Sequence, residues 1–177
     1  MIDRNFLLSK LKPFQNKNIL LYDNQSTSDI IKVLLQAHKI YTNQYDKICM
    51  YFWKGNVYKT CQYIYDFLKK NVKYSIEPDT RQSVKSPSAI IVTGQYYSGM
   101  NDCKHYSSFI GGILSALCRK GININWKYRF ANYKLFNTVP HHVFCVCVVN
   151  NNEIWIDPVI NGFNVKKRYI NKIDKKI

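Results

Sequence analysis

The stretch NDCKHYSSFIGGILSALCRKG, residues 101–121, decides the fold of this chain. Its apolar side chains recur at the spacing of one face of an α-helix, and they are Tyr106, Phe109, Ile110, Ile113, Leu114 and Leu117. Two basic residues close the pattern, and Gly121 follows as a helix stop. We therefore predict a central, buried helix that carries Cys103 at its N-terminus.

The position of Cys103 favours a thiolate. A helix N-terminus carries partial positive charge and free N–H groups, and both stabilise an anionic sulfur. A thiolate attacks a carbonyl carbon efficiently when an imidazole exchanges the proton and a third group orients the imidazole ring. A histidine and an orienting side chain should therefore approach Cys103 in space.

Downstream of residue 121 the apolar period changes from helical to alternating. Segments 122–133, 141–149 and 152–160 are rich in β-branched and aromatic residues and are separated by turn residues. Upstream, residues 30–37 and 57–72 have helical spacing. The segment 76–102 is interrupted by Pro and Gly and should be largely loop, with one short turn of helix around residues 88–92. Helices followed by a meander of strands predict an α+β fold with an antiparallel sheet.

Two of the predicted strands end in residues that suit the site. His142 opens the segment HVFCVCVV and Asp157 ends the segment EIWIDP, so a hairpin between these strands brings the two side chains together. By strand alternation Phe144, Val146 and Val148 share a face with His142. We expect that face to pack on the central helix while His142 meets Cys103.

Two other histidines compete for the role of the base. His141 is the alternative to His142, because a register slip of one residue exchanges the two faces of a strand. His105 follows Cys103 by two positions, and side chains at that spacing on a helix do not face each other. We expect His105 in the core or at the rim of a pocket.

These blocks resemble the transglutaminase-like, papain-related superfamily of cysteine enzymes over residues 57 to 160. The run around Cys103 is similar to its G-D-C-x-x-[YH]-[AS] helix start, with Asn101 in place of the usual Gly, and HVFCVCV and EIWIDPV look like its histidine and aspartate segments. The resemblance implies that Cys103 is the nucleophile, His142 the base and acid, and Asp157 the orienting group. It further implies that the backbone N–H of Cys103 and the amide of Gln95 stabilise the oxyanion.

The resemblance implies two classes of function. The first is a thiol peptidase, amidase or acyl transferase that forms a thioester at Cys103, with a protein or peptide substrate and with water as the favoured acceptor. The pattern KSPSAII…DCKHYSSF is also similar to small transglutaminase-like proteins encoded among the head and tail genes of bacteriophages of Bacteroidota. The alternative is therefore a virion structural protein, a ring, neck or tail component that keeps the fold and assembles as a homo-oligomer or with other virion proteins.

Composition adds limits on partners and location. Lys and Arg number 26 against 11 for Asp and Glu, a formal charge of +15 that allows contact with nucleic acid through a basic surface. No stretch is apolar enough to predict a membrane span, and six scattered cysteines suit a reducing compartment such as a host cytoplasm. We expect a basic arm at 1–28, the transglutaminase-like domain at 29–165 and a basic tail at 166–177.

We expect neither a cofactor nor a metal. Cys145 and Cys147 lie two apart on a strand, facing away from His142, and no second Cys-x-x-Cys arm is present to complete a zinc site. The sequence also lacks a phosphate-binding glycine motif, since Gly111 and Gly112 lie inside the predicted helix.

Overall fold

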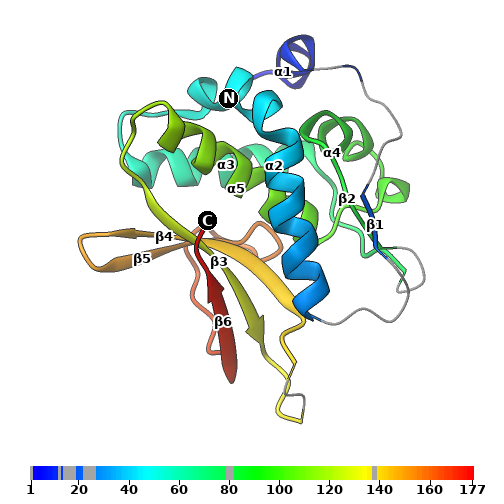
Figure 1. Ribbon diagram of the computed structural model, residues 1–177, viewed down its shortest axis with the longest axis vertical. Coiled ribbons are helices and arrows are strands. Elements are labelled where there is room, and N and C mark those ends of the chain that lie inside the picture. The colour runs from blue at the N-terminus through cyan, green and yellow to red at the C-terminus, as the bar shows by residue number, and fades with distance from the viewer. Residues whose placement is uncertain (1, 12, 14–18, 22–26, 79–81, 137–138) are drawn as a thin grey trace.

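The predicted central helix is α5, Cys103–Arg119, and the other elements are arranged around it (Figure 1). The computed structural model describes residues 2–11, 13, 19–21, 27–78, 82–136 and 139–177. The remaining helices are α1 (Arg4–Lys10), α2 (Thr27–Phe52), α3 (Val57–Asn71), α4 (Pro87–Thr93) and a single 3₁₀ turn (Tyr97–Gly99). The strands are β1 (Ile19–Leu21), β2 (Gln82–Val84), β3 (Asn125–Asn132), β4 (His142–Val149), β5 (Asn152–Ile156) and β6 (Asn171–Lys175).

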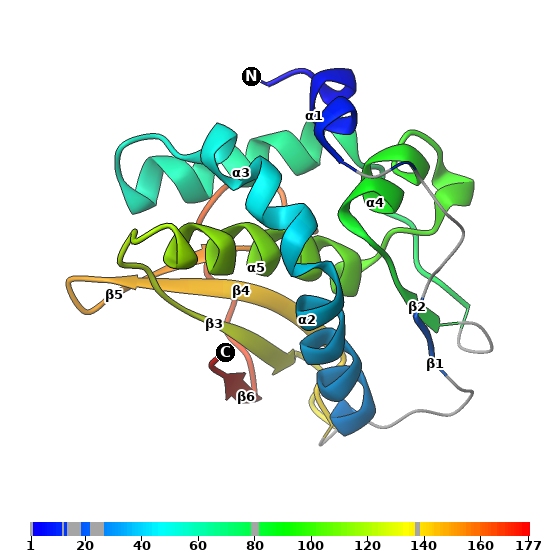
Figure 2. The ribbon, with the colours of Figure 1, turned by 45° about the horizontal axis from the view of Figure 1, so that its top comes forward.

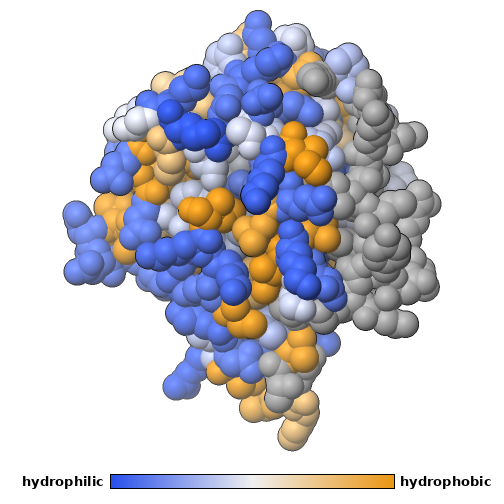
Figure 3. All heavy atoms as spheres, viewed as in Figure 1, coloured by the Kyte–Doolittle hydropathy of each residue, from blue (hydrophilic) through white to orange (hydrophobic). Residues whose placement is uncertain are grey.

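The main sheet is antiparallel, in the order β5-β4-β3-β6, and β1 pairs with β2 in a separate ribbon. Helices α2, α3 and α5 lie on one side of the main sheet (Figure 2), so the α+β class predicted from the sequence is confirmed. Within the described residues, no helix combines the length and the apolar character needed to cross a membrane. Hydrophilic residues cover most of the face shown in Figure 3, with smaller apolar areas between them.

Helix α5 fits closely between α2 and the sheet because it contains two adjacent glycines. A Cβ at Gly112 would lie 2.3 Å from ring atoms of Tyr45 on α2, and a Cβ at Gly111 would lie 2.5 Å from the Tyr128 hydroxyl on β3. The Tyr45 ring is itself fully buried and packs edge-on against Phe109. The glycines therefore allow the helix to be buried on two sides.

Both predicted termini take part in the fold, contrary to the predicted boundaries. Leu7 on α1 and Leu11 just after it are buried in the main core, although they belong to the predicted arm. In the predicted tail, β6 pairs with β3, and Asp174 binds the fully buried Arg129 with an Nε–Oδ1 distance of 2.8 Å. A charged segment can form an edge strand when its neighbour offers a buried ion-pair partner, and the composition alone did not reveal that partner.

The prediction for the two faces of β4 was wrong. Val143, Cys145 and Cys147 belong to the core under the helices, and Ser107 on α5 donates to the Val143 carbonyl at 2.9 Å. Phe144 lies on the opposite face, in a small separate cluster with three other buried residues: Ala131, Val146 and Trp155. Both faces of β4 are apolar, so alternation alone could not decide which face meets the helix.

The glycine contact predicts that Gly112→Ala destabilises the protein, although Ala is the better helix former. The added methyl group has to displace a fully buried ring, which should lower the free energy of unfolding by about 1–3 kcal/mol in urea denaturation. Ser115→Ala on the same helix, where the side chain is only half-buried, serves as the control and should be close to neutral. A neutral Gly112→Ala would contradict the close packing of α2 on α5.

Candidate active site

The N-terminus of α5 is capped by two reciprocal hydrogen bonds. Asp102 is the N-cap, and its carboxylate accepts from the backbone N–H of Lys104 at 3.0 Å. The backbone N–H of Asp102 in turn donates to Nδ1 of His105 at 3.1 Å. Cys103 is therefore the first residue of the helix, and its own N–H bonds no acceptor in the described part of the chain. That N–H and the half-buried thiol are both available to a ligand.

His142 and Asp157 form a direct pair. The Nε2 atom of His142 lies 2.7 Å from Oδ2 of Asp157, and both side chains are largely buried. In the antiparallel β4–β5 register Cys145 pairs with Ile156, so the next residue, Asp157, comes opposite Phe144. His142, two residues before Phe144, is then the diagonal neighbour of Asp157. A diagonal pair on one face of a sheet is within reach of long side chains. The predicted hairpin thus brings these two residues together.

Cys103 interacts with the His142 member of this pair. Burial lowers the pKa of His142, but the hydrogen bond with Asp157 and the interaction with the Cys103 thiol outweigh burial and raise the pKa to about 10. Because Nε2 is bonded to Asp157, Nδ1 is the ring nitrogen left for the thiol. Cys103 therefore lies close to the pair that His142 forms with Asp157.

Cys103 and His142 both line one pocket, which has a volume of about 540 Å³. The segment after α3 contributes Tyr74 and Ile76 to its wall. The backbone of Tyr74 pairs with that of Asn101, just before Cys103, and the phenol hydroxyl of Tyr74 bonds no atom of the described residues. Proximity to Cys103 adds to the burial that raises the pKa of this phenol. Tyr74 was not predicted as a site residue, since a single Tyr in a loop gives no pattern.

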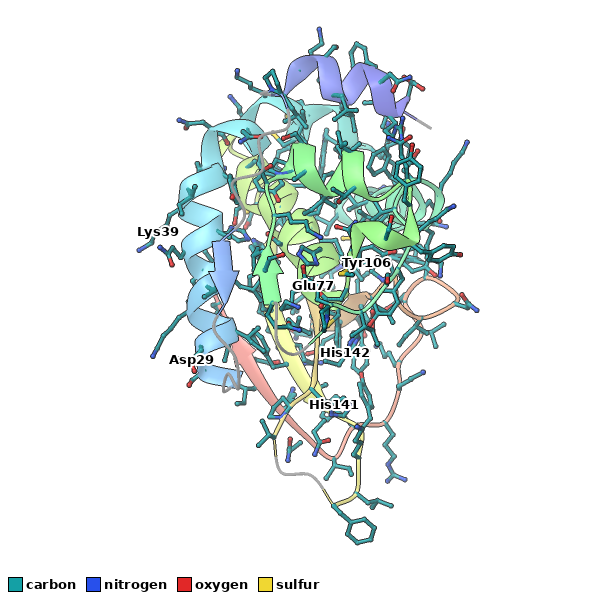
Figure 4. The ribbon with its side chains drawn as sticks, turned by 90° about the vertical axis from the view of Figure 1, so that its right-hand side faces the viewer. Asp29, Lys39, Glu77, Tyr106, His141 and His142 are labelled. Carbon is teal, nitrogen blue, oxygen red and sulfur yellow. The ribbon has the colours of Figure 1, made fainter. Side chains whose placement is uncertain are left out.

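The other predicted site residues lie differently. Gln95 does not line this pocket: its amide donates to the Val92 carbonyl at 3.3 Å, and its side chain borders a separate hollow with Arg4 and Lys73. His141 is exposed at the pocket wall beside Tyr133 and makes no pair with Asp157. Figure 4 shows His142 between Glu77 and His141 in that view. Of the two adjacent histidines, His142 is the one bonded to the carboxylate.

Behind the start of α5 lies a cluster of buried charges that the sequence did not predict. Glu77, Lys85, Asp102 and Lys104 are each at most 5% exposed, and His105 is fully buried. The Glu77 carboxylate lies 3.6 Å from both Lys85 and Lys104, and Lys104 also binds Asp102. Neighbouring His105 and Lys104 outweigh the effect of burial and hold the pKa of Asp102 below its ordinary range.

The cluster fixes the loop that leads to Cys103. The Lys85 ammonium donates to the carbonyls of Gly99 and Met100, each at 2.6 Å. Met100 has a left-handed backbone with a φ of 46°, which is unfavourable for a side-chain-bearing residue and needs support from its surroundings. Lys85 provides that support.

Three members of the cluster could in principle hold a metal ion. Potential ligand atoms of Glu77, Asp102 and His105 lie within 4.8 Å of one another. Both carboxylates, however, already face buried ammonium groups, Lys85 and Lys104 for Glu77 and Lys104 for Asp102. A divalent cation would have to displace or repel these ammonium groups, so the charge balance fits an internal ion-pair network better than a metal centre.

Comparisons with known proteins give no family assignment: no family model matches the chain, and no curated protein matches it. Among solved structures, it is similar to a candidate protease from Parabacteroides distasonis ATCC 8503, with a TM-score of 0.47 and 10% identity over 73% of this chain and 26% of that one. It is also similar to a candidate cysteine protease from Cytophaga hutchinsonii, with a TM-score of 0.45 and 19% identity over 97% of this chain and 52% of that one. The chain thus spans about a quarter and about half of the lengths of these proteins.

The charge cluster predicts a large effect of Glu77→Gln on stability. The substitution leaves two buried ammonium groups with one carboxylate, so the free energy of unfolding should fall by roughly 3–5 kcal/mol in urea denaturation. Asp46→Asn, which breaks a more exposed pair with Arg119, is the control and should change it by less than about 1 kcal/mol. A similar small loss for both variants would show that the cluster is unimportant for folding.

The raised pKa of His142 predicts how stability depends on pH. The pKa in the folded chain, about 10, exceeds the ordinary value of 6.5, so the folded state binds the extra proton. The resulting stabilisation is complete below the ordinary pKa and is lost as pH rises through the folded pKa, by at most about 1.4 kcal/mol per pH unit.

Denaturant unfolding of the wild type should therefore show stability falling between about pH 7 and pH 10, and His142→Gln should flatten this slope. His141→Gln is the matched control: burial lowers the pKa of His141, so its titration lies below this range. Equal slopes in His142→Gln and the wild type would argue against the raised pKa.

Proposed function

We propose that the chain is a cysteine hydrolase of the transglutaminase-like, papain-related class, which cleaves amide bonds in a peptide or isopeptide through a thioester on Cys103. One observation carries the proposal: Cys103, at a helix N-terminus, interacts with a histidine whose Nε2 lies 2.7 Å from a buried carboxylate. These contacts support the assignment of Cys103 as nucleophile, His142 as base and Asp157 as orienting group.

In the first half-reaction the Cys103 thiolate attacks the amide carbonyl carbon. A C–S bond forms, and the carbonyl electron pair moves to oxygen to give a tetrahedral oxyanion. As the C–N bond breaks, the His142 imidazolium donates its proton to the departing amine. The amine leaves protonated, and the acyl group stays on sulfur as a thioester.

In the second half-reaction water replaces the amine. Neutral His142 takes a proton from water as the oxygen attacks the thioester carbon, and the C–S bond breaks. The acyl group leaves as a carboxylic acid, and the Cys103 thiolate and the His142 imidazolium are restored. Asp157 holds the ring so that Nδ1 faces the sulfur in both steps.

Two donors are available for the oxyanion. Neither the backbone N–H of Cys103 nor the phenol hydroxyl of Tyr74, which lines the same pocket, bonds another group within the described part of the chain. Gln95, which the resemblance to papain-like enzymes suggested, binds its own helix end instead. We therefore assign the second donor position to Tyr74.

The proposal predicts that Cys103 reacts with iodoacetamide at about pH 6 much faster than the other cysteines, since an ordinary thiol is almost fully protonated there. Peptide mass spectrometry after timed labelling measures each rate. Cys118, which is also half-buried on α5 but lies at its far end, is the internal control. Asp157→Asn should slow labelling of Cys103 roughly ten-fold or more, because the ring loses its orienting charge. Equal alkylation rates at Cys103 and Cys118 would contradict the proposal.

Tyr74→Phe tests the assignment of the oxyanion donor. Loss of one such donor commonly lowers kcat by about 10²-fold, so hydrolysis of fluorogenic acyl-coumarin amides should fall by roughly that factor. Alkylation of Cys103 forms no oxyanion and should be far less affected. Tyr96→Phe, a nearby exposed tyrosine that does not line the pocket, is the matched control. A loss of both reactions in Tyr74→Phe would indicate a packing role for this residue.

A further inference from the structure

The pocket above Cys103 carries an uneven distribution of charge. The connection between β5 and β6 contributes Lys167 and Arg168 to its wall, and His141 adds a third group that can become cationic. Among the described residues that line the pocket, none is an aspartate or a glutamate. Asp157 is buried behind His142 and is bonded to it. A molecule that enters the pocket therefore meets positive charge close to the thiol.

Lys167 and Arg168 are also free to bind a ligand. Both are exposed, and neither forms an ion pair within the described part of the chain. This differs from the cations on the nearby sheet, where Lys127 and Arg129 are bound to Glu153 and Asp174. Cations that carry no internal partner at the wall of a reactive pocket attract an external anion.

The rest of the pocket wall is apolar. Ile76 is 70% exposed beside Tyr74, and Val159 and Ile160 follow Asp157 on the other segment. Exposed aliphatic side chains around a reactive group suit the side chain of a peptide better than a fully polar ligand. The pocket thus combines an apolar surface with two cations that form no ion pair with any described residue.

We propose that the substrate of this site is an acidic one, a peptide or isopeptide with a carboxylate near the scissile amide, and that Lys167 and Arg168 bind this carboxylate. This inference rests on the proposed function, because it assumes that the acyl group reacts at Cys103. It specifies a property that the fold does not determine, namely the charge of the substrate.

Iodoacetate and iodoacetamide provide a matched test, since they have the same shape and differ in one negative charge. Each reagent is applied to the full chain at about pH 6 and low salt, and the alkylation rate of Cys103 is measured by peptide mass spectrometry. The quantity compared between variants is the ratio of the iodoacetate rate to the iodoacetamide rate. A change in the reactivity of the thiol itself affects both rates equally and cancels in this ratio. The contribution of the His142 charge is the same in all variants, so it cancels when variants are compared.

The double variant Lys167→Gln/Arg168→Gln should lower this ratio by roughly three- to ten-fold, the range expected for two partly exposed ion pairs. The matched control is Lys39→Gln/Lys47→Gln on α2, which removes the same net charge away from the pocket. Lys39 lies on the outer side of α2 (Figure 4), and both residues are exposed. The control should leave the ratio nearly unchanged, and about 1 M NaCl should reduce the difference between the variants.

Three results would overturn the inference. Equal ratios in the pocket variant and the control would show that the effect comes from overall charge, and the acidic substrate would then be rejected while the enzyme proposal stands. A ratio that rises in the pocket variant would reject it in the same way. If Cys103 reacts with neither reagent faster than Cys118 does, the proposed function itself fails and the inference fails with it.

Discussion

The start of α5 depends on buried charges that neutralise one another. Asp102 caps the helix, Lys104 binds Asp102 and faces Glu77, and Lys85 connects Glu77 to the carbonyls of the preceding loop. Buried charges are tolerated only when each has a partner, so these residues fix one another's positions. Cys103 belongs to this turn, which sets the place of its sulfur, and its N–H bonds no acceptor among the residues that the structure describes.

A second set of contacts fixes α5 on the sheet and so fixes Cys103 relative to His142. Ser107 donates to the Val143 carbonyl, and the Cys145 thiol donates to the Ser107 carbonyl, so one turn of the helix is bonded to the start of β4. The glycines at 111 and 112 let the same helix approach α2 and β3. The geometry of the candidate site thus follows from ordinary packing of one helix, and the unusual feature is the group of charges at its N-terminus.

Sequence periodicity predicted α5 and the strands β3, β4 and β5, and the strand ends predicted the meeting of His142 with Asp157. Prediction from the sequence failed where the deciding interaction joins residues far apart in the chain. On the outer face of β4, Trp155 stacks on Tyr169. Strand β6 is attached to β3 by the ion pair between Asp174 and Arg129. Neither contact has a local pattern. The same holds for Glu77 and Lys85, which lie in a loop-rich segment and become a cluster only once the chain has folded.

The most direct test of the account is the protonation state of His142, read from the imidazole ¹⁵N chemical shifts in long-range ¹H–¹⁵N NMR spectra. At about pH 8 most histidines are neutral, since their ordinary pKa is about 6.5. The account predicts an imidazolium at His142 at that pH, because Asp157 and Cys103 raise its pKa to about 10, and it predicts loss of that proton in Asp157→Asn. A neutral His142 ring at about pH 8 in the wild type would contradict the coupled arrangement of Cys103, His142 and Asp157.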